Sequence, residues 1–233
     1  MNTTKEPMPN SRQLLFPGIA AHLETLSTTL DTIAEPHHSA GQELAAWIAA
    51  ASNGGRSIIV VCTGNSRRSL LGALMGQAAA AYYGLPQVRF FSGGTAPSAF
   101  NPRTIRALQA IGFEIEPVGE EAPRGEPNLP NPKYRIRWGA AGSGFESIEF
   151  SKVYSDRSNP QTGFAALMVC DEANAACPVV SGAELRLPMP FADPKAADDT
   201  PDEVARYAAT RDAFGRLMMG VLAEVATKPR RLA

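Results

Sequence analysis

The sequence predicts an α/β protein whose open parallel sheet forms one of three layers, and three observations support this. An apolar run, Ile58 to Cys62, leads through a glycine-containing loop into a helix-like stretch. Further short apolar runs alternate with helical segments, which is typical of βαβ units. The composition, 44% hydrophobic and 19% charged over 233 residues, is that of a globular protein with room for one large domain and an appendage.

Residues 1–55 are predicted to form a helical extension. The stretch Leu14–Ile33 is expected to be one helix, because its apolar residues recur at spacings of three and four. These residues are Ile19, Leu23, Leu26, Leu30 and Ile33. Pro36 breaks the pattern, a second helix is expected over Gln42–Ala51, and Ser52–Gly55 is typical of a turn. The two helices either pack on the main domain or form a homodimer interface.

The main domain, residues 56–233, is predicted to alternate strands with helices. The expected strands are Ser57–Cys62, Gln87–Phe91, Glu114–Val118, Ala165–Cys170 and a short run at Leu185–Pro188. The expected helices are Arg67–Tyr83, Asn101–Ile111 and Pro201–Ala226. An insert at about residues 119–163 contains two alternating runs, Lys133–Trp138 and Ser147–Tyr154, which predict a β-hairpin. The hairpin is either a lid or partner-binding flap, or a decoration of the surface.

The loop after the first strand is the strongest functional signal. It reads Cys62-Thr63-Gly64-Asn65-Ser66-Arg67-Arg68-Ser69. A short loop between a strand and a helix N-terminus turns several backbone N–H groups into one small space, which suits an anion. The same field favours a thiolate at Cys62, and Arg68 can hold a tetrahedral oxyanion with two parallel hydrogen bonds. The loop is therefore predicted to support covalent attack on phosphate or a phosphate mimic. The expected oxyanion-binding residues are Thr63, Gly64, Asn65, Ser66, Arg67 and Arg68.

Two further features belong to the same edge of the predicted sheet. Asp193, before Pro194, is a candidate acid for a leaving oxygen, although Asp-Pro is also a common turn. Cys170 ends a later strand, so it should lie on the same rim as Cys62. Cys177 follows seven residues on, which is about 10.5 Å along a helix and beyond the reach of a disulfide. The pair is either a redox switch that requires the helix to unwind, or two inert thiols.

Composition excludes several classes. A net charge of −1 without a basic run argues against nucleic-acid binding. No apolar stretch approaches the roughly 20 residues that span a bilayer, and the N-terminus lacks a signal-peptide pattern, so a cytoplasmic location is expected. Three cysteines in a reducing compartment do not suggest a disulfide framework. The three histidines lack a further ligand at metal-binding spacing, so no metal site is expected.

Taken together, these motifs resemble the low-molecular-weight protein tyrosine phosphatase superfamily, in particular its thioredoxin-coupled arsenate reductases. The resemblance rests on the Cys62–Ser69 loop, the Cys170 and Cys177 pair, and Asp193-Pro194. It also includes Phe91–Thr95, Asn101–Ile105 and Gly112–Ile115. It covers about residues 57–118 and 164–226. The extension and the insert lie outside it.

The resemblance implies a role for each site residue. Cys62 would attack arsenic, Ser69 would steady its thiolate, and Arg68 with the loop amides would hold the oxyanion. Asp193 would protonate the departing oxygen. Cys170 would then attack the Cys62 adduct and release arsenite.

The resemblance also implies partners. Cys177 would take over the Cys62–Cys170 disulfide, and a thioredoxin-like reductant would reduce the resulting Cys170–Cys177 bond. Thiol exchange supplies both electrons, so no organic cofactor is needed; a potassium ion near Asn65 is a possibility in this family. Arg67 departs from the pattern, because many of these reductases have a cysteine there, and it is expected to add positive charge to the loop.

Two alternatives remain open. A phosphatase acting on phosphotyrosine or a small phosphoester needs only Cys62, Arg68 and Asp193, with water as the second nucleophile. The run Lys195–Asp199 lacks the aromatic residues that usually follow the Asp-Pro of those phosphatases. A non-catalytic oxyanion or redox sensor is the second alternative, and the intact cysteine, arginine and acid argue against it.

Overall fold

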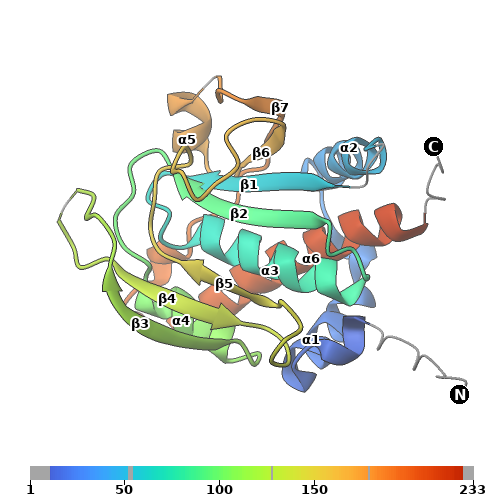
Figure 1. Cartoon of the computed structure of the whole chain (residues 1–233), viewed down its shortest axis with the longest axis horizontal. Helices are drawn as coiled ribbons and strands as arrows, with labels where there is room; N and C mark the ends of the chain where they lie inside the picture. Colours follow the sequence, from blue (N-terminus) through green and yellow to red (C-terminus); the bar gives the residue numbers. More distant parts are fainter. Residues whose placement is uncertain (1–10, 52–54, 127, 178, 228–233) are drawn as a thin grey trace, which may run out of the picture.

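Four parallel strands form the central sheet, in the order β2-β1-β6-β7 (Figure 1). The structure, a computed structural model, describes residues 11–51, 55–126, 128–177 and 179–227. The four strands are β1 (Arg56–Cys62), β2 (Val88–Gly94), β6 (Phe164–Met168) and β7 (Ala183–Pro188). The neighbouring strands pair in parallel, and the central strands β1 and β6 are almost wholly buried, as continuous apolar runs predict. The predicted α/β class with a parallel sheet is confirmed.

The helix α3 (Arg68–Tyr82) begins at the loop and runs back beneath the sheet. Its small residues allow it to lie close to β1 and β2: a Cβ at Gly76 would come within 2.6 Å of the Phe90 ring. The long helix α6 (Glu203–Thr227) packs on α3, and Figure 1 shows both helices on the same side of the strands as α1 and α4. This packing fixes the start of α3, and with it the end of the loop.

The insert forms a second, antiparallel sheet in the order β3-β4-β5. Its strands are β3 (Glu114–Glu121), β4 (Pro132–Arg137) and β5 (Glu146–Glu149). The predicted hairpin is confirmed, but the prediction that Glu114–Val118 belongs to the parallel sheet is wrong. Only one face of β3 is covered, with Ile115 buried between exposed glutamates, and such alternation suits an antiparallel strand that faces water on one side.

The second predicted run of the insert, Ser147–Tyr154, divides into two parts. The strand β5 ends at Glu149, and the chain then crosses to the carboxyl end of β2. There Val153 forms a parallel bridge with Gly94. Gly94 must be a glycine at this crossing, because a Cβ would lie 2.5 Å from the carbonyl oxygen of Thr63. The Ser151 hydroxyl of the insert donates to the Gly64 carbonyl oxygen, so the insert touches the loop after β1 directly.

The N-terminal extension consists of short helices. They are η1 (Ser11–Leu14), α1 (Pro17–Ser27), η2 (Leu30–Thr32) and α2 (His37–Ala49). The predicted single helix over Leu14–Ile33 is wrong. Three hydroxyl side chains at the end of α1, of Ser27, Thr28 and Thr29, donate to carbonyl groups one turn earlier and compete with further helical hydrogen bonds.

The apolar residues of the extension face their own chain. Ile19, Leu23 and Leu26 are buried, and α1 and α2 both pack against α6. This apolar face is therefore covered within the molecule, as the first of the two alternatives from the sequence expects. The second helix begins at His37, earlier than predicted, and most of the predicted turn at Ser52–Gly55 lies outside the described residues.

The remaining elements lie around the sheet. They are α4 (Pro102–Gln109), α5 (Asp171–Ala176) and the 3₁₀ turn η3 (Pro194–Ala197). Asn101 caps α4 by accepting a hydrogen bond from the N–H of Arg103. In the part of the chain that the structure describes, no helix combines the length and the apolar character needed to cross a membrane.

Candidate active site

The loop between β1 and α3 has its carbonyl groups held on the outside. The carbonyl oxygens of Cys62, Thr63, Gly64 and Ser66 accept hydrogen bonds from the N–H groups of Thr95, Ala96, Ser98 and Asn101. In a planar trans peptide the C=O and the following N–H point in opposite directions. The N–H groups of Thr63, Gly64, Asn65 and Arg67 are therefore turned toward the inside of the loop, where an oxyanion would bind.

The insert clamps this loop from the outside. The Ser151 hydroxyl donates to the Gly64 carbonyl oxygen at 2.9 Å, and the Lys152 N–H donates to Asn65 Oδ1 at 2.8 Å. Asn131 in turn holds the backbone of Ser151 through both ends of its amide. None of these partners was predicted, because nothing local in the sequence marks them.

Cys62, Ser69 and Asn65 form a chain of buried contacts. The Cys62 Sγ lies 3.1 Å from Ser69 Oγ, and Ser69 Oγ accepts a hydrogen bond from Asn65 Nδ2 at 2.8 Å. Since Asn65 supplies the proton on that side, the Ser69 hydroxyl hydrogen is left to point at sulfur. The predicted contact between Ser69 and Cys62 is thus present in the structure.

Arg68 and Asp193 are brought together. Arg68 Nη2 lies 2.8 Å from Asp193 Oδ2, and Arg68 Nη1 donates to the Phe191 carbonyl oxygen at 3.1 Å. The arginine side chain is 10% exposed and that of Asp193 35%, so the carboxylate lies at the open side of the pair. Asp193 also caps η3 by accepting from the Lys195 N–H. The structure thereby brings the candidate acid to the arginine at the end of the loop.

The Arg67 side chain points elsewhere. It donates to the hydroxyl of Tyr207 at 2.7 Å and to Asp198 Oδ2 at 3.0 Å. Tyr207 donates to the same carboxylate, and burial together with this hydrogen bond raises the pKa of Tyr207 to about 12. The expectation that Arg67 adds its charge to the loop is wrong, because Asp198 neutralises it. Only the backbone N–H of Arg67 belongs to the loop.

Cys170 lies beside the loop. It follows β6, the neighbour of β1, and its Sγ lies 3.4 Å from the Thr63 hydroxyl. The Cys170 sulfur also accepts a hydrogen bond from the Ala173 N–H at the start of α5. At 1% exposure the thiol is closed to solvent. The predicted placement of Cys62 and Cys170 on one rim is therefore what the structure has.

Cys177 lies at the other end of α5 and is partly exposed. All three cysteines are free thiols. Tyr154 of the insert is near Cys177: burial raises the pKa of Tyr154, and the neighbouring thiol raises it further. Since the whole of α5 separates Cys170 from Cys177, a disulfide between them requires α5 to unwind.

The potassium ion implied by the resemblance would lie near Asn65. The Asn65 amide oxygen accepts one hydrogen bond, from the Lys152 N–H, and its amide nitrogen donates to Ser69. Among the described residues, no three histidine, cysteine, aspartate or glutamate side chains are grouped in a way that would hold a metal ion.

The fold and the loop together define a class: an α/β protein with a cysteine-bearing loop after the first strand of a parallel sheet. No protein-family model matches the chain, and neither does any curated protein sequence. Solved structures of low-molecular-weight protein tyrosine phosphatases and of an arsenate reductase do match it.

Three of these structures illustrate the likeness. A low-molecular-weight phosphotyrosine phosphatase from Vibrio cholerae O395 is 14% identical, with 72% of this chain and 95% of that chain covered and a TM-score of 0.46. A mutant of YwlE from Bacillus subtilis is 15% identical, with 73% and 99% covered and a TM-score of 0.46. An arsenate reductase in its phosphate-binding state is 14% identical, with 73% and 98% covered and a TM-score of 0.43. Sequence identities and TM-scores this low do not distinguish one reaction from another.

Proposed function

We propose that this chain is a cysteine-dependent oxyanion enzyme that reduces arsenate to arsenite through Cys62, Cys170 and Cys177. The observation that supports this most is the contact between Cys170 Sγ and the Thr63 hydroxyl at 3.4 Å, next to Cys62 in the chain. A second thiol beside the oxyanion loop has a use in reduction and none in hydrolysis.

Substrate binding would exchange one partner of Arg68 for another. Arg68 pairs with Asp193 in the structure. An arsenate dianion inside the loop offers two oxygens to the guanidinium and competes with that carboxylate. Asp193, released from Arg68, then lies beside the bound oxyanion, where it can act as the acid for a departing oxygen.

The first chemical step joins sulfur to arsenic. The Cys62 thiolate attacks arsenic, an As–O bond breaks, and the oxygen leaves as water with a proton from Asp193. The product is a Cys62–arsenic(V) adduct held by the loop N–H groups and Arg68. Ser69 steadies the thiolate before the attack through the contact at 3.1 Å.

The second step reduces arsenic. The Cys170 thiolate attacks Cys62 sulfur, a disulfide forms, and the electron pair of the S–As bond goes to arsenic, which leaves as arsenite. The Cys177 thiolate then attacks Cys170 sulfur and frees Cys62 as a thiolate. This exchange requires α5 to unwind, and a helix of six residues has little stability of its own. A thioredoxin-like dithiol then reduces Cys170–Cys177 from the side where Cys177 is exposed.

The second candidate function is hydrolysis of phosphotyrosine or a small phosphoester. It is supported by the contact of Arg68 with Asp193 near the Cys62 loop, because these three groups are sufficient for a phosphocysteine route. The cysteine pair has no task in that reaction. For this reason we place arsenate reduction first.

The test measures both reactions in one preparation. Purified protein is assayed with arsenate, thioredoxin, thioredoxin reductase and NADPH, and in parallel with p-nitrophenyl phosphate. Arsenate-dependent NADPH oxidation that is lost in both Cys62→Ser and Cys177→Ser supports the three-thiol route. Hydrolysis that survives Cys177→Ser, without arsenate-dependent NADPH oxidation, supports the phosphatase instead.

A further inference from the structure

The C-terminal end of α5 is held by the side chain of Arg186, which lies on β7. Arg186 Nε donates to the Cys177 carbonyl oxygen at 3.0 Å, and Arg186 Nη2 donates to the Asn174 carbonyl oxygen at 2.8 Å and to Asn174 Oδ1 at 2.6 Å. Carbonyl groups in the last turn of a helix lack helical partners, and a nearby arginine can satisfy them. Residue 178 is a proline and has no N–H to offer the Asn174 carbonyl oxygen four residues earlier.

The arginine itself is anchored in the central sheet. In the pairing of β7 with β6, Arg186 lies opposite Ala166. Its guanidinium is half-buried and reaches from this strand to the last turn of α5. A positive charge at the C-terminal end of a helix is favourable, because the helix dipole is negative there. A fixed strand therefore supplies the group that holds the end of a short helix.

The N-terminal end of α5 is fixed to the same sheet. Cys170 follows Val169, whose N–H donates to the Val61 carbonyl oxygen and whose carbonyl oxygen accepts from the Phe191 N–H. The Cys170 thiol is only 1% exposed. Seven residues of helix span about 10.5 Å, whereas a disulfide needs Cα atoms within about 7 Å of each other. Since Cys170 is anchored, a disulfide between the two requires Cys177 to move.

Movement of Cys177 breaks the contacts with Arg186. The helical turn brings two carbonyl oxygens, those of Asn174 and Cys177, to one guanidinium. When the segment unwinds and Cys177 approaches Cys170, these oxygens no longer share that position. A contact that exists in one of two states shifts the equilibrium toward that state. The Arg186 contacts therefore favour the helical state, in which both cysteines are thiols.

We propose that Arg186 is a positioning residue that holds α5 helical and thereby favours the dithiol over the disulfide at Cys170 and Cys177. The proposal rests on the proposed function, because that reaction is what gives the cysteine pair its redox use. In that reaction, Arg186 makes the Cys170–Cys177 disulfide easier for a thioredoxin-like dithiol to reduce, so it favours the return of the enzyme to its reduced form.

The test measures the thiol–disulfide equilibrium of the full chain carrying Cys62→Ser, in which Cys170 and Cys177 are the remaining cysteines. Oxidised glutathione is the oxidant. The two thiols lose two electrons and two protons and form the disulfide, and one oxidised glutathione becomes two reduced glutathione molecules. After equilibration over a range of glutathione ratios, the remaining thiols are alkylated in acid and counted by mass spectrometry, which also separates mixed disulfides with glutathione.

Arg186→Ala should raise the equilibrium constant for disulfide formation about tenfold, the effect of losing one hydrogen bond from a charged donor. For this two-electron couple, the reduction potential of the pair should fall by about 30 mV. Arg186→Lys should give an intermediate value, because an ammonium group lacks the planar fork that binds two oxygens at once. An equilibrium constant that is unchanged or lower in Arg186→Ala overturns the proposal.

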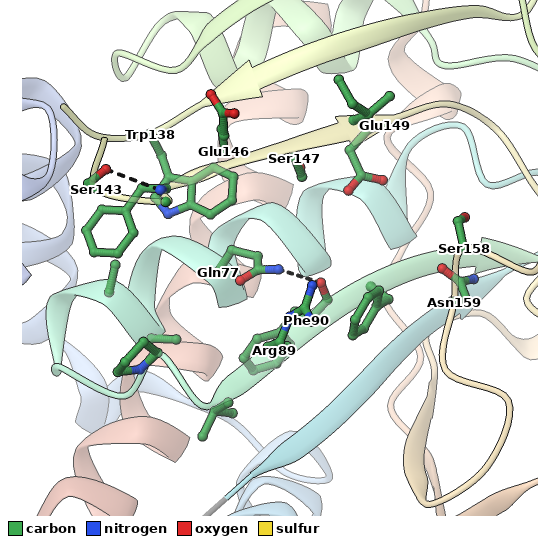
Figure 2. Close-up of a pocket in the computed structure, with 18 of the residues that line it drawn as sticks. Gln77, Arg89, Phe90, Trp138, Ser143, Glu146, Ser147, Glu149, Ser158 and Asn159 are labelled. Carbon is green, nitrogen blue, oxygen red and sulfur yellow. Dashed lines mark hydrogen bonds between the residues drawn. The ribbon is translucent and has the colours of Figure 1, made fainter. Parts of the chain in front are cut away.

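Arg89→Ala is the matched control. Arg89 lies on β2, at the opposite edge of the sheet from β7, and lines the pocket that Figure 2 shows. Its guanidinium packs over the Phe91 ring, 5.1 Å from the ring centre. Arg89→Ala removes the same charge and leaves the contacts of α5 intact, so the equilibrium constant should not change. An equal shift in Arg89→Ala and Arg186→Ala would reflect net charge and overturns the proposal.

Hydrogen exchange of the reduced protein tests the helix itself. The N–H groups of Asn174 and Cys177 donate to carbonyl oxygens one turn earlier, so their exchange reports the opening of α5. Both should exchange about tenfold faster in Arg186→Ala and at the parent rate in Arg89→Ala. Equal rates in all three proteins overturn the proposal. A thermal unfolding transition shows that each variant is folded, and Arg186→Lys serves for both measurements if Arg186→Ala shows none.

The outcomes separate this proposal from the proposed function. An unchanged equilibrium constant, with arsenate-dependent NADPH oxidation by the wild type, overturns the role of Arg186 alone. The expected shift without arsenate reduction supports the role of Arg186 and contradicts the proposed function. If the Cys62→Ser protein forms no disulfide at any glutathione ratio, both the role of Arg186 and the three-thiol route are overturned.

Discussion

At the scale of single residues, Asn65 links the insert to Cys62. Its amide accepts from Lys152 N–H and donates to Ser69 Oγ, which in turn contacts Cys62 Sγ. Its φ of +41° lies in the left-handed region, which asparagine adopts more readily than most residues. Asn65 thus adopts the left-handed backbone conformation that the loop requires, and its amide orients the Ser69 hydroxyl toward the Cys62 sulfur.

Two substitutions at this position separate these requirements. Asn65→Ala and Asn65→Gly both remove the amide, so both should lower turnover about 10- to 100-fold through the loss of a hydrogen bond that orients a charged group. Only alanine is strained at a positive φ, so Asn65→Ala should be less stable than Asn65→Gly by about 1 kcal/mol. Steady-state kinetics and urea unfolding check the two effects. Full turnover in Asn65→Gly would contradict the role of the amide.

At the scale of elements, the N-terminal extension supports the segment that carries the candidate acid. At the start of α2, the His37 ring nitrogen Nε2 lies 2.8 Å from the Pro190 carbonyl oxygen, and the ring stacks on Phe191 at 4.2 Å. Phe191 also stacks on Phe214 of α6 at 3.9 Å. The carbonyl oxygen of Phe191 receives Arg68, so the extension contributes to the position of both Arg68 and Asp193.

The adjacent histidine gives a matched control for this role. His37→Ala removes the stacking and the hydrogen bond, so kcat should fall about 3- to 10-fold, as expected for displaced catalytic groups. His38→Ala alters a half-exposed side chain near Glu35 and should leave kcat unchanged. Arsenate-dependent turnover and the pH profile of kcat check this. If the two variants behave alike, the extension has no part in positioning the loop.

The sequence predicted elements where local pattern decides the structure. The central strands are confirmed because runs such as Ile58–Cys62 are apolar on both faces, which only a covered parallel strand needs. Glu114–Val118 was wrongly placed because a short run does not say which sheet it joins, although its alternating glutamates favoured an antiparallel one. The helix over Leu14–Ile33 was predicted too long because periodicity does not register the competing hydroxyls of Ser27 to Thr29.

The residues of the candidate site likewise fall into two groups, those that a local sequence pattern predicts and those that it does not. The Cys62–Ser69 loop was predictable because its residues are contiguous and their chemistry depends on spacing. Its supports were not, because Ser151 lies 87 positions from Gly64 and Tyr207 lies 140 positions from Arg67. No local pattern marks such partners. The role given to the Arg67 side chain failed for this reason.

At the scale of the whole molecule, Asp212 of α6 ties stability to pH. Burial raises the pKa of this carboxyl, but hydrogen bonds with His22 of α1 and with Arg211 lower it more, so the pKa lies below the ordinary value of 3.8. The folded protein therefore binds fewer protons at Asp212 than the unfolded chain. The stabilisation is present above the ordinary pKa and is lost as the pH falls through the folded value.

Asp212→Asn isolates this contribution. The wild type should lose free energy of unfolding as the pH falls below the ordinary value of 3.8 and through the lower folded pKa of Asp212, and the variant should lose less over the same range. The two proteins should therefore differ most at neutral pH and converge in acid. Urea unfolding at three pH values checks this. Parallel curves with a constant difference would show that Asp212 stabilises the protein without titration.

The sequence separation between the Cys62–Ser69 loop and the insert residues that hold it has a consequence for the nascent chain. Ser151 and Lys152 are each 87 positions beyond the loop residues they hold. Synthesis proceeds from the N-terminus, so the ribosome releases the whole Cys62–Ser69 motif long before those clamps exist. A chain that ends before residue 150 contains every residue of the motif but lacks Ser151 and Lys152, which hold the loop in shape. The loop around Cys62 therefore gains these supports only after residue 152 of the 233 has been synthesised.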